Sequence, residues 1–143
     1  MRVSLRGVSP PVWRRLLIPE KITIAQLHHV MQFAMGWNDK HLHQFIIRGW
    51  RYGGHRDGAP QFFDGPDTLS LAAFGLHEHE RLAYVYDFTA WWLHDVRLER
   101  RTHNQRSTRV PCCIAGAGRC PSEHAGGPEG IVRLLGRSLK MAR

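Results

Sequence analysis

The fold of this chain is decided by the stretch Pro10–Phe45, which reads PPVWRRLLIPEKITIAQLHHVMQFAMGWNDKHLHQF. Within it, Thr23 is followed three residues later by Gln26, the pattern of a capping box, in which two side chains satisfy free backbone N–H groups at a helix start. Apolar residues then recur at steps of three and four: Ile24, Leu27, Val30, Met31, Ala34 and Met35. Gly36 suits the left-handed conformation that ends many helices. The stretch therefore predicts an amphipathic helix that packs its apolar face against a sheet.

Strand patterns surround this helix. The segment Val3–Val8 alternates between apolar and polar residues and then meets two prolines, which indicates a strand that ends in a rigid turn. Further strands are expected at Val12–Ile18, Leu42–Arg48, Leu82–Phe88 and Trp92–Leu98, with Gly49–Tyr52 continuing the second of these through a bend. The strict alternation of the last two strands, with a tight connection near Thr89 and Ala90, predicts an antiparallel hairpin.

The remaining segments carry weaker patterns. Residues 53–67 are rich in Gly, Pro and Asp and indicate a surface loop, whereas Thr68–Phe74 fits one or two helical turns. Between Thr102 and Gly130 regular alternation is missing, and five glycines predict a Gly-rich loop. Pro128 marks the start of a C-terminal helix that should be short or frayed, because Ser138 interrupts its apolar face. The expected fold is α+β: a mostly antiparallel sheet packed against one main amphipathic helix, with a Gly-rich loop and a short C-terminal helix.

Length and composition bound the class of protein. A chain of 143 residues supports one domain with its own core. No apolar run reaches about 18 residues, and Met1–Leu5 lacks the apolar core of a secretion signal, so we expect a cytoplasmic protein with no membrane segment. The three cysteines are an odd number in a leaderless chain, which argues against a disulfide framework.

Arginine dominates the basic residues, since 17 Arg stand against 3 Lys and the net charge is +8. Guanidinium groups fork onto phosphate, so one reading is a nucleic-acid surface, and the other is charge dispersed for solubility. A binding surface needs clustered charge, and only Arg97, Arg100, Arg101, Arg106 and Arg109 are clustered in the sequence, which favours dispersed charge.

Cys113, Cys120 and His124 form the sharpest candidate metal site, with Cys112 beside them and His94 as a distant fourth ligand. Thiolates and imidazoles are the ligands that Zn²⁺ prefers, and a Gly-rich loop can fold them around a tetrahedral ion. The spacing is not that of a C-x2-C knuckle, so buried or incidental thiols are the alternative.

Two pairs of histidines have different expected placements. His41 and His43 lie two residues apart, so on a strand they project from one face and can share a ligand or an anion. The alternative is that one imidazole bonds to the backbone while the other faces solvent. His28 and His29 are adjacent on the helix, where side chains diverge, and are expected at the surface.

The run Trp13-Arg14-Arg15 can present an aromatic ring and two guanidinium groups to an anionic or nucleic-acid partner. Strand alternation offers the alternative that Trp13 packs in the core with Arg15 beside it while Arg14 points outward. Trp92 carries the same alternative between binding and packing.

Asp87 and His94 face each other across the hairpin and are a candidate acid/base pair. Alternation places them on opposite faces of the sheet unless a bulge intervenes, which argues against a dyad. The sequence contains no P-loop, dinucleotide fingerprint or nucleophile elbow, so no catalytic residue is assigned.

Eight blocks of the sequence occur in an order and spacing typical of one family. They are Leu5–Val8, Pro10–Arg15, Thr23–His28, Met35–Trp37, His41–Phe45, Tyr86–Phe88, Trp92–His94 and Ala115–Pro121. Over nearly its whole length the chain resembles the plasmid ORF-three-like family, first named from a root-inducing plasmid and also described as the TnpR-type passenger protein of some insertion elements.

The resemblance implies a compact α+β domain that travels with mobile elements and has no established activity. It does not imply resolvase chemistry, because neither a nucleophilic Ser in an arginine-lined site nor a DNA-reading helix pair is present in the sequence. Where the family reads Asp-Phe-Gly-Asp, this chain has Asp87-Phe88-Thr89-Ala90, and Ala125 replaces a frequent cysteine. The chain also lacks the longer family tail, so we expect a single domain over residues 1–143, truncated at its C-terminus.

The sequence therefore favours a nonenzymatic accessory or binding protein of a plasmid or insertion element, with nucleic acid or a mobile-element protein as partner. The alternative is a metal-dependent hydrolase or a metal-stapled domain that uses the Cys and His ligands, with zinc as the candidate ion. The oligomeric state is not determined by any pattern in the sequence.

Overall fold

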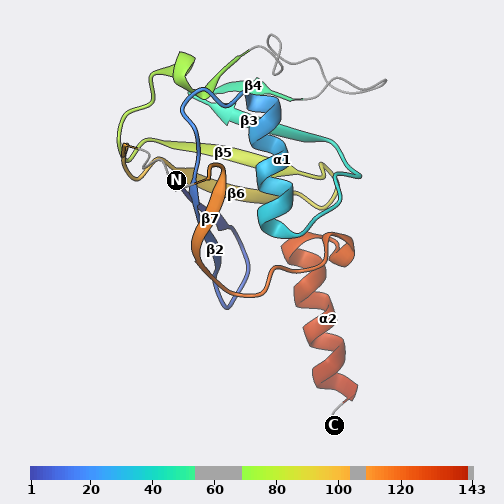
Figure 1. Ribbon diagram of the computed structural model, residues 1–143. Helices are drawn as coiled ribbons and strands as arrows, with labels where there is room; N and C mark the ends of the chain where they lie inside the picture. The colour runs from blue at the N-terminus through green and yellow to red at the C-terminus, as the bar shows by residue number, and fades with distance from the viewer. Residues whose placement is uncertain (54–68, 104–108, 142–143) are drawn as a thin grey trace.

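The computed structural model describes residues 1–53, 69–103 and 109–141 (Figure 1). In chain order the elements are β1 (Arg2–Leu5), β2 (Val12–Leu17), α1 (Ile24–Met35), β3 (His43–Ile47), β4 (Trp50–Tyr52), the 3-10 helix η1 (Leu71–Phe74), β5 (Arg81–Tyr86), β6 (Trp92–Arg97), β7 (Cys112–Ala117), the 3-10 helix η2 (Glu123–Ala125) and α2 (Gly127–Met141). The strands form one sheet in the order β4-β3-β5-β6-β1-β2-β7, and every neighbouring pair is antiparallel. The predicted α+β class and antiparallel sheet are confirmed.

Helix α1 has the boundaries that its sequence predicts. The Thr23 hydroxyl accepts the Gln26 N–H at 3.1 Å, and the Gln26 carboxamide oxygen accepts the Thr23 N–H at 3.0 Å, so the capping box is formed. At the other end Gly36 takes the left-handed conformation with φ 73°. The buried side chains include the predicted apolar positions Ile24, Leu27, Met31 and Met35. They also include two polar residues, His28 and Gln32, that reappear in the site below.

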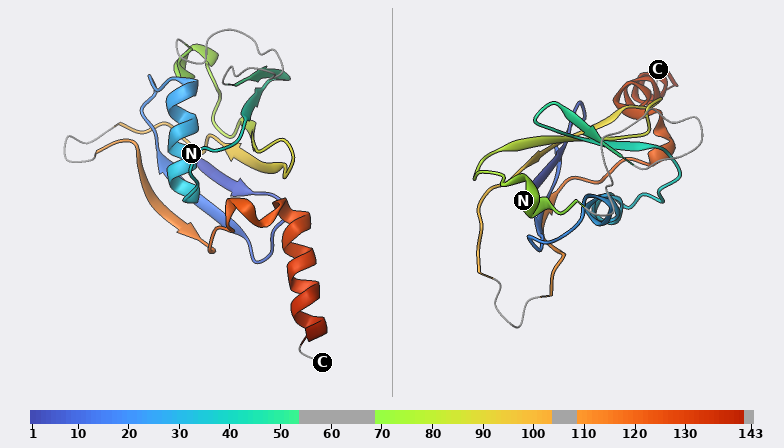
Figure 2. Two further views of the ribbon diagram at one scale, coloured as in Figure 1. Left: turned by 90° about the vertical axis from the view of Figure 1, so that its right-hand side faces the viewer. Right: turned by 90° about the horizontal axis from the view of Figure 1, so that it is seen from above.

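The sheet has two faces of different character. Helix α1 lies across one of them, in front of β3, β5 and β6 in Figure 1 and nearly end-on in the right-hand view of Figure 2. Val3, Val96 and Leu82 lie opposite one another on neighbouring strands, and all three are buried in the core that α1 shares. We call this side the helix face and the opposite side the outer face.

Strand β7 corrects the prediction of a Gly-rich loop, because Cys112–Ala117 pairs with β2 along the edge of the sheet. Gly116 explains the error. A Cβ atom at this position would lie 2.8 Å from the carbonyl oxygen of Trp13, so only glycine lets the two strands approach this closely. A glycine required by close strand contact has the same sequence signature as a loop glycine.

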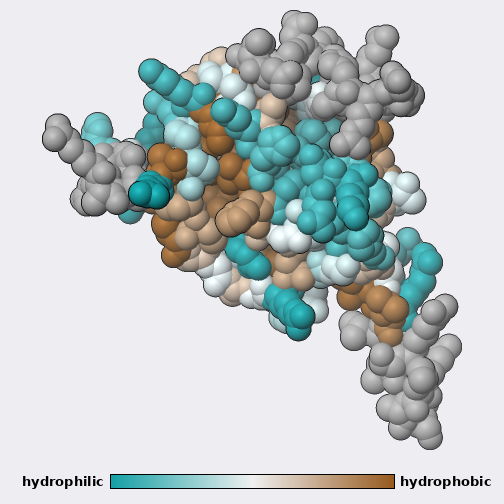
Figure 3. Space-filling view, turned by 45° about the vertical axis from the view of Figure 1, so that its right-hand side comes forward, coloured by the Kyte–Doolittle hydropathy of each residue, from teal (hydrophilic) through white to brown (hydrophobic). Residues whose placement is uncertain are grey.

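Two more expectations, for the end of β3 and for the length of the C-terminal helix, are wrong. The segment Gly49–Tyr52 does not continue β3, because Gly49 adopts φ 84° and β4 runs back antiparallel to β3. Helix α2 is not short: it runs for 15 residues and stays helical through Ser138. On the view in Figure 3 hydrophobic side chains gather on this helix, where Val132 and Leu134 are exposed. The sheet therefore dominates the fold, rather than one main helix packed on it.

Other local predictions can be compared directly. The antiparallel β5–β6 hairpin is confirmed, and the helical turns expected before Gly75 are present as η1. The loop predicted for residues 53–67 lies outside the described residues except for Gly53. Within the described ranges, no helix combines the length and the apolar character needed to cross a membrane.

Candidate functional site

The candidate binding residues singled out in the sequence lie in two regions of the sheet. The first region is β2, which carries Trp13, Arg14 and Arg15. The second is the end of the sheet near the C-terminal half of α1, where five residues lie on or beside β3, β5 and β6: His41, His43, Asp87, Trp92 and His94. Each region also contains residues that the sequence did not single out.

Four arginines lie directly opposite one another on four neighbouring strands. Arg15 on β2 pairs with Arg2 on β1, and Arg2 pairs on its other side with Arg97 on β6. Arg97 in turn pairs with Arg81 on β5. Directly opposed residues project from the same face, here the outer face, and adjacent strands lie about 4.8 Å apart, so the four residues span roughly 14 Å. We call this set the arginine row.

The arginine row is only partly neutralised by carboxylates. Arg15 donates two hydrogen bonds to Glu99, from Nε at 2.8 Å and from a terminal nitrogen at 3.0 Å. These hydrogen bonds lower the pKa of Glu99, which therefore stays ionised at neutral pH. At the other end Arg81 lies 3.9 Å from Asp95. Two carboxylates beside four guanidinium groups leave the row positively charged, and like charges directly opposite one another destabilise a sheet.

Trp13 lies beside the arginine row on the outer face. The guanidinium carbon of Arg2 is 4.3 Å from the centroid of the indole ring and that of Arg15 is 5.3 Å away, both within cation–π range. The expectation that alternation buries Trp13 in the core is wrong, because Val12 and Leu16 take the inward positions of β2. The aromatic ring is therefore part of the cationic face.

Arg14 is not part of this surface. One of its terminal nitrogens donates to the carbonyl oxygens of Trp13 at 2.8 Å and Ala117 at 2.9 Å, and the other donates to that of Gly118 at 2.9 Å. These bonds attach the end of β7 to β2. Arg14 therefore has a structural contact, whereas the sequence offered it either as a binding residue or, by strand alternation, as an outward-pointing residue.

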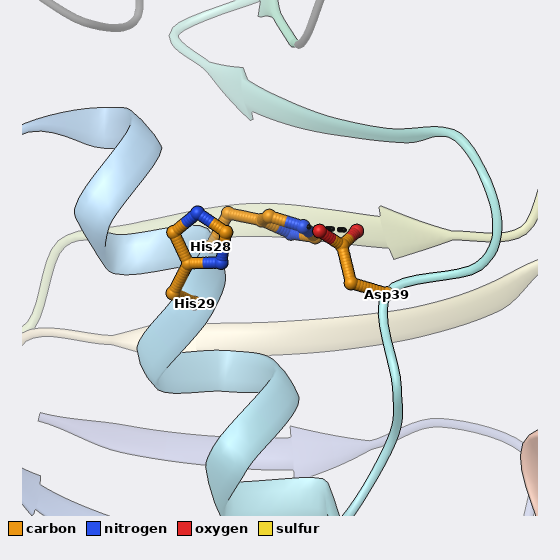
Figure 4. A group of neighbouring side chains, drawn as sticks. All are labelled: His28, His29 and Asp39. Atoms are coloured by element: carbon orange, nitrogen blue, oxygen red, sulfur yellow. Dashed lines mark hydrogen bonds and ion pairs between the residues drawn. The ribbon is translucent and has the colours of Figure 1, made fainter.

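On the helix face four residues form a closed ring of hydrogen bonds. The Gln32 amide nitrogen donates to the Tyr84 hydroxyl at 2.9 Å, and that hydroxyl lies 2.7 Å from Nδ1 of His28. Nε2 of His28 lies 2.7 Å from a carboxylate oxygen of Asp39. Figure 4 draws this contact as a dashed line. The backbone N–H of Asp39 donates to the Gln32 amide oxygen at 2.9 Å and closes the ring.

Counting donors and acceptors around the ring assigns its protons. Because the Asp39 N–H needs an acceptor, the Gln32 oxygen faces it and the Gln32 nitrogen donates to Tyr84. The Tyr84 hydroxyl then donates its own proton to Nδ1 of His28. His28 is left with its proton on Nε2 and donates it to Asp39. Burial raises the pKa of Tyr84 well above its ordinary value, so this hydroxyl keeps its proton.

His28 was expected at the surface, and this prediction is wrong. It lies one helical turn after Ile24 and therefore belongs to the inward stripe of α1, whereas its neighbour His29 is exposed as expected. The ring of His43 stacks on that of His28 with centroids 3.4 Å apart and an interplanar angle of 6°. The structure thus brings predicted His43 against a partner that the sequence did not indicate.

A second polar contact lies beside this ring, at the base of the β5–β6 turn. Nε2 of His41 lies 3.7 Å from a carboxylate oxygen of Asp87. The other Asp87 oxygen accepts the N–H groups of Thr89 at 3.0 Å and Ala90 at 3.2 Å. Asp87 therefore caps the turn, and its backbone adopts the left-handed conformation with φ 63°.

Glu123 on η2 is a buried carboxylate that links η2 to β5 and to the segment after α1. It accepts the Tyr86 hydroxyl at 2.6 Å and the N–H of Asn38 at 2.9 Å. Burial by itself raises the pKa of Glu123, but the bonds from Tyr86 and Asn38 and the nearby His124 and His41 lower it by more. The side chain therefore remains ionised at neutral pH.

Trp92 and His94 are completely buried. Nδ1 of His94 lies 3.1 Å from the carbonyl oxygen of Tyr84 and 2.9 Å from that of Trp92, and since carbonyls only accept, this nitrogen carries the proton. Burial lowers the pKa of His94 to about 4, so the ring is neutral. Its hydrogen bonds go to the backbone and those of Asp87 go to the turn, so the contacts described here do not form the acid/base pair considered from the sequence.

The three residues proposed as metal ligands lie in different surroundings. Cys113 is exposed on β7 and its thiol donates to the carbonyl oxygen of Ala115 at 3.3 Å. Cys120 is half-buried with its sulfur 3.7 Å from that of Met35, and burial raises the pKa of its thiol to about 11. Together with the exposed His124 they do not converge within 4.8 Å in the part of the chain that the structure describes.

A different group does converge in the described ranges. Donor atoms of His28, His29 and Asp39 lie within 4.8 Å of one another (Figure 4). A metal ligand must offer a lone pair, but the hydrogen-bonded ring places a proton on Nε2 of His28, directed at Asp39. In this arrangement the group ties α1 to the segment after it, and metal binding would require the ring to open.

A family model described as plasmid pRiA4b ORF-3-like protein matches residues 1–139. The chain belongs to this family. It is 34% identical over 134 residues to the uncharacterized protein y4hQ of Sinorhizobium fredii, a match that covers 91% of this chain and 67% of the relative. It is also similar to the crystal structure of a protein of unknown function, MM3350 from Methanosarcina mazei Go1, with a TM-score of 0.83 and 31% identity over 94% of this chain and 76% of that one.

In this plasmid ORF-3-like protein, sequence reasoning missed residues of both regions. Arg2 and Arg81 complete the arginine row, but each is an isolated cation in the sequence: Arg2 lies between the buried Met1 and Val3, and Arg81 precedes the buried Leu82. Only the strand register shows that the two belong to one line. For Tyr84 the available signal was the strand alternation, which marks it as inward-facing, so that its hydroxyl needs a buried partner.

Proposed function

We propose that this plasmid ORF-3-like protein is a nonenzymatic accessory protein that binds nucleic acid through the arginine row. The observation that carries the proposal is the register, which aligns Arg15, Arg2, Arg97 and Arg81 across four strands of one face. Arginine is the side chain best suited to bidentate contact with phosphate. A line of four such groups matches a chain of phosphates better than it matches one small anion.

The energetic cost of the row supports a binding role. Like charges directly opposite one another in a sheet each destabilise the fold by a few tenths of a kcal/mol or more, and here three such pairs follow in succession. A phosphate backbone would remove this repulsion on binding. Trp13 adds an aromatic surface beside the row, and base–aromatic stacking is a common companion of phosphate contacts in single-strand binding.

Fluorescence anisotropy with a labelled DNA oligonucleotide tests the proposal. We expect binding that weakens steeply as salt rises, because each phosphate contact releases counterions. Replacing Arg2 and Arg97 by Gln should weaken binding by about 1 kcal/mol per residue and reduce the salt slope by about one for each lost contact. Arg51→Gln and Arg133→Gln are the matched controls, since both residues are exposed and lie outside the row.

Absence of binding at low salt would reject nucleic acid as the partner. Equal losses in row and control variants would reject the row as the site, because bulk charge alone would then account for the affinity. The sequence also suggested a mobile-element protein as partner. An acidic protein surface would need the same arginines, but would leave DNA unbound under every salt condition.

The association with a plasmid or insertion element is part of the same proposal. It is supported by the family to which the chain belongs, whose description names a plasmid. The neighbouring genes test it directly: a transposase or replication gene next to this one is the expected finding. Unrelated housekeeping neighbours in several genomes would remove this part of the proposal without affecting the binding experiment.

The second candidate function is metal binding. Its site is now His28, His29 and Asp39, because the donor atoms of these residues converge. Elemental analysis of purified protein distinguishes the two functions. About one zinc per chain, lost in His29→Ala and retained in His77→Ala, would support a metal-stapled domain. A folded protein without stoichiometric metal would remove this candidate and leave the binding proposal in place.

A further inference from the structure

A second row of side chains runs beside the arginine row on the outer face. Ser4 on β1 lies opposite Trp13 on β2 and, on its other side, opposite Asp95 on β6. Asp95 in turn lies opposite Ala83 on β5. Each of these residues stands two positions along its strand from a member of the arginine row, so it projects from the same face. We call this set the second row, and it runs parallel to the arginine row at a distance of roughly 6–7 Å.

The two rows differ in chemistry. The arginine row carries cations, whereas the second row carries an indole ring, a hydroxyl, a carboxylate and a methyl group, all of them partly exposed. The distance between the rows is comparable with the distance from a phosphate to its base within one nucleotide. A strand whose phosphates lie on the arginine row therefore brings its bases to the second row.

The position of both rows within the sheet favours a single strand over a duplex. The strands that carry them, β2, β1, β6 and β5, are inner strands, since β4 and β7 form the two edges among the described strands. The major groove of a duplex is about 12 Å wide and admits a helix or a two-stranded ribbon, but not the face of four adjacent strands. The base edges of a duplex therefore stay out of reach, whereas a single strand can lie across the face with its bases turned toward it.

Asp95 is the member of the second row that phosphate binding alone does not explain, because a carboxylate repels phosphate. Its ion pair with Arg81 has a distance of 3.9 Å, which is too long for a hydrogen bond, and the Arg81 side chain is 62% exposed. Exposed ion pairs of this kind contribute little to stability. The Asp95 carboxylate can therefore accept hydrogen bonds from a ligand that lies on the outer face.

We propose that the nucleic acid bound by the arginine row is a single strand and that Asp95 selects guanine among its bases, an inference that rests on the function proposed above. The Watson–Crick edge of guanine presents two neighbouring donors, N1–H and the N2 amino group, which match the two oxygens of a carboxylate. Adenine and cytosine present an amino group beside an acceptor nitrogen, and thymine presents one N–H between two acceptors. Each of these three bases would turn an acceptor toward the carboxylate, so guanine is the base that fits.

Fluorescence anisotropy of the full chain with labelled single strands tests the proposal. The probes are a short thymidine oligonucleotide and the same strand with its two central bases replaced by guanine or by hypoxanthine, which lacks the N2 amino group. We expect the guanine strand to bind at least about fivefold more tightly than the thymidine strand, and hypoxanthine to lose most of this gain. Pairing the same guanines in a duplex should abolish the preference, because cytosine then occupies the edge.

The outcomes separate this inference from the function on which it rests. Equal affinity for the guanine and thymidine single strands would overturn the selection by Asp95 and leave nucleic-acid binding in place. A guanine preference that persists in the duplex would overturn the single-strand assignment. Absence of binding by every strand at low salt would reject nucleic-acid binding itself, and this inference with it.

Asp95→Asn provides the second arm, because asparagine keeps the size of the side chain but replaces one acceptor by a donor. The ratio of the affinities for the guanine and thymidine strands should fall to about one in this variant. Glu129→Gln on α2 makes the same change of charge on a side chain that is 88% exposed and lies outside both rows, and it should keep the ratio of the parent chain. Because the ratio compares two ligands of one protein, a change in stability does not alter it. A guanine preference that survives in Asp95→Asn, or one that is lost equally in Glu129→Gln, would contradict base selection by Asp95.

Discussion

The two faces of the sheet differ in how their polar groups are paired. On the helix face the buried side chains of Gln32, Tyr84 and His28 and the part-buried Asp39 meet in a ring in which each donor has an acceptor. On the outer face the arginine row places cations side by side, with two carboxylates for four guanidinium groups. The first arrangement stabilises the fold, and the second opposes it.

This difference distinguishes polar residues that stabilise the fold from charged residues whose alignment does not. A buried polar group without a partner costs about 1–3 kcal/mol, so a closed network needs no function beyond holding elements together. Like charges in register bring no such benefit to the folded chain. The outer face, with its unbalanced positive charge, is therefore the better candidate for a binding surface than the histidines of the helix face.

The largest predicted effect is the loss of folding stability at acid pH caused by the buried His94 on the helix face. Burial lowers the pKa of His94 from 6.5 to about 4 in the folded chain. The unfolded chain therefore takes up this proton first as the pH falls. The stability contributed by the neutral ring is complete above pH 6.5 and is lost progressively down to about pH 4. We expect the free energy of unfolding to fall by on the order of 2–3 kcal/mol across this window.

His94→Asn is the variant that isolates this effect. Its carboxamide can still donate to the carbonyl oxygens of Tyr84 and Trp92 but does not titrate. Urea denaturation at a series of pH values should show a flatter dependence for the variant, whatever its absolute stability. Parallel curves for variant and parent chain would mean that His94 is not the titrating group.

Tyr84→Phe opens the hydrogen-bonded ring by removing the hydroxyl that links His28 to Gln32. The change leaves Nδ1 of His28 and the amide nitrogen of Gln32 without their partner, so unfolding should become easier by about 2 kcal/mol. Tyr52→Phe is the control, with an expected change within about 0.5 kcal/mol. Nucleic-acid affinity should be unchanged in both. A loss of affinity in Tyr84→Phe alone would show that the two faces are coupled, contrary to the comparison.

Trp13→Leu tests whether the aromatic ring beside the row contributes to binding. Loss of one stacking surface should weaken single-stranded DNA binding by about 1 kcal/mol. Trp91→Leu removes an exposed tryptophan of the β5–β6 turn and should have no effect. If duplex and single-stranded DNA lose affinity equally in Trp13→Leu, the indole acts by orienting Arg2 and Arg15 rather than by stacking.

The smallest expected effect is an increase in folding stability. Arg97→Gln removes the cation that faces Arg2 on one side and Arg81 on the other, so the free energy of unfolding should rise by about 0.5 kcal/mol at low salt. At 1 M salt the Debye length is about 3 Å and the gain should disappear. A loss of stability in low salt would mean that the hydrogen bond from Arg97 to His79 outweighs the repulsion.

Helix α1 and the β5–β6 hairpin could be predicted because their signals are local. The capping box joins residues three apart, and the hairpin alternates on both sides of a short turn. Strand β7 could not, since Gly116 is required by contact with β2 and has no local pattern. Of the candidate site residues, the structure brings His43 to His28 and His41 to Asp87, while it separates Cys113 from Cys120 in burial and contacts.

By itself, the sequence determined the family, the α+β class, the limits of α1 and an excess of arginine over lysine. Only the tertiary structure decided which arginines stand in one row and which histidine is buried in the ring. Arg2 and Arg97 are far apart in the chain, and their alignment depends on the register between β1 and β6. That register follows from burying Val3 against Val96 on the opposite face, a packing preference that no local pattern encodes.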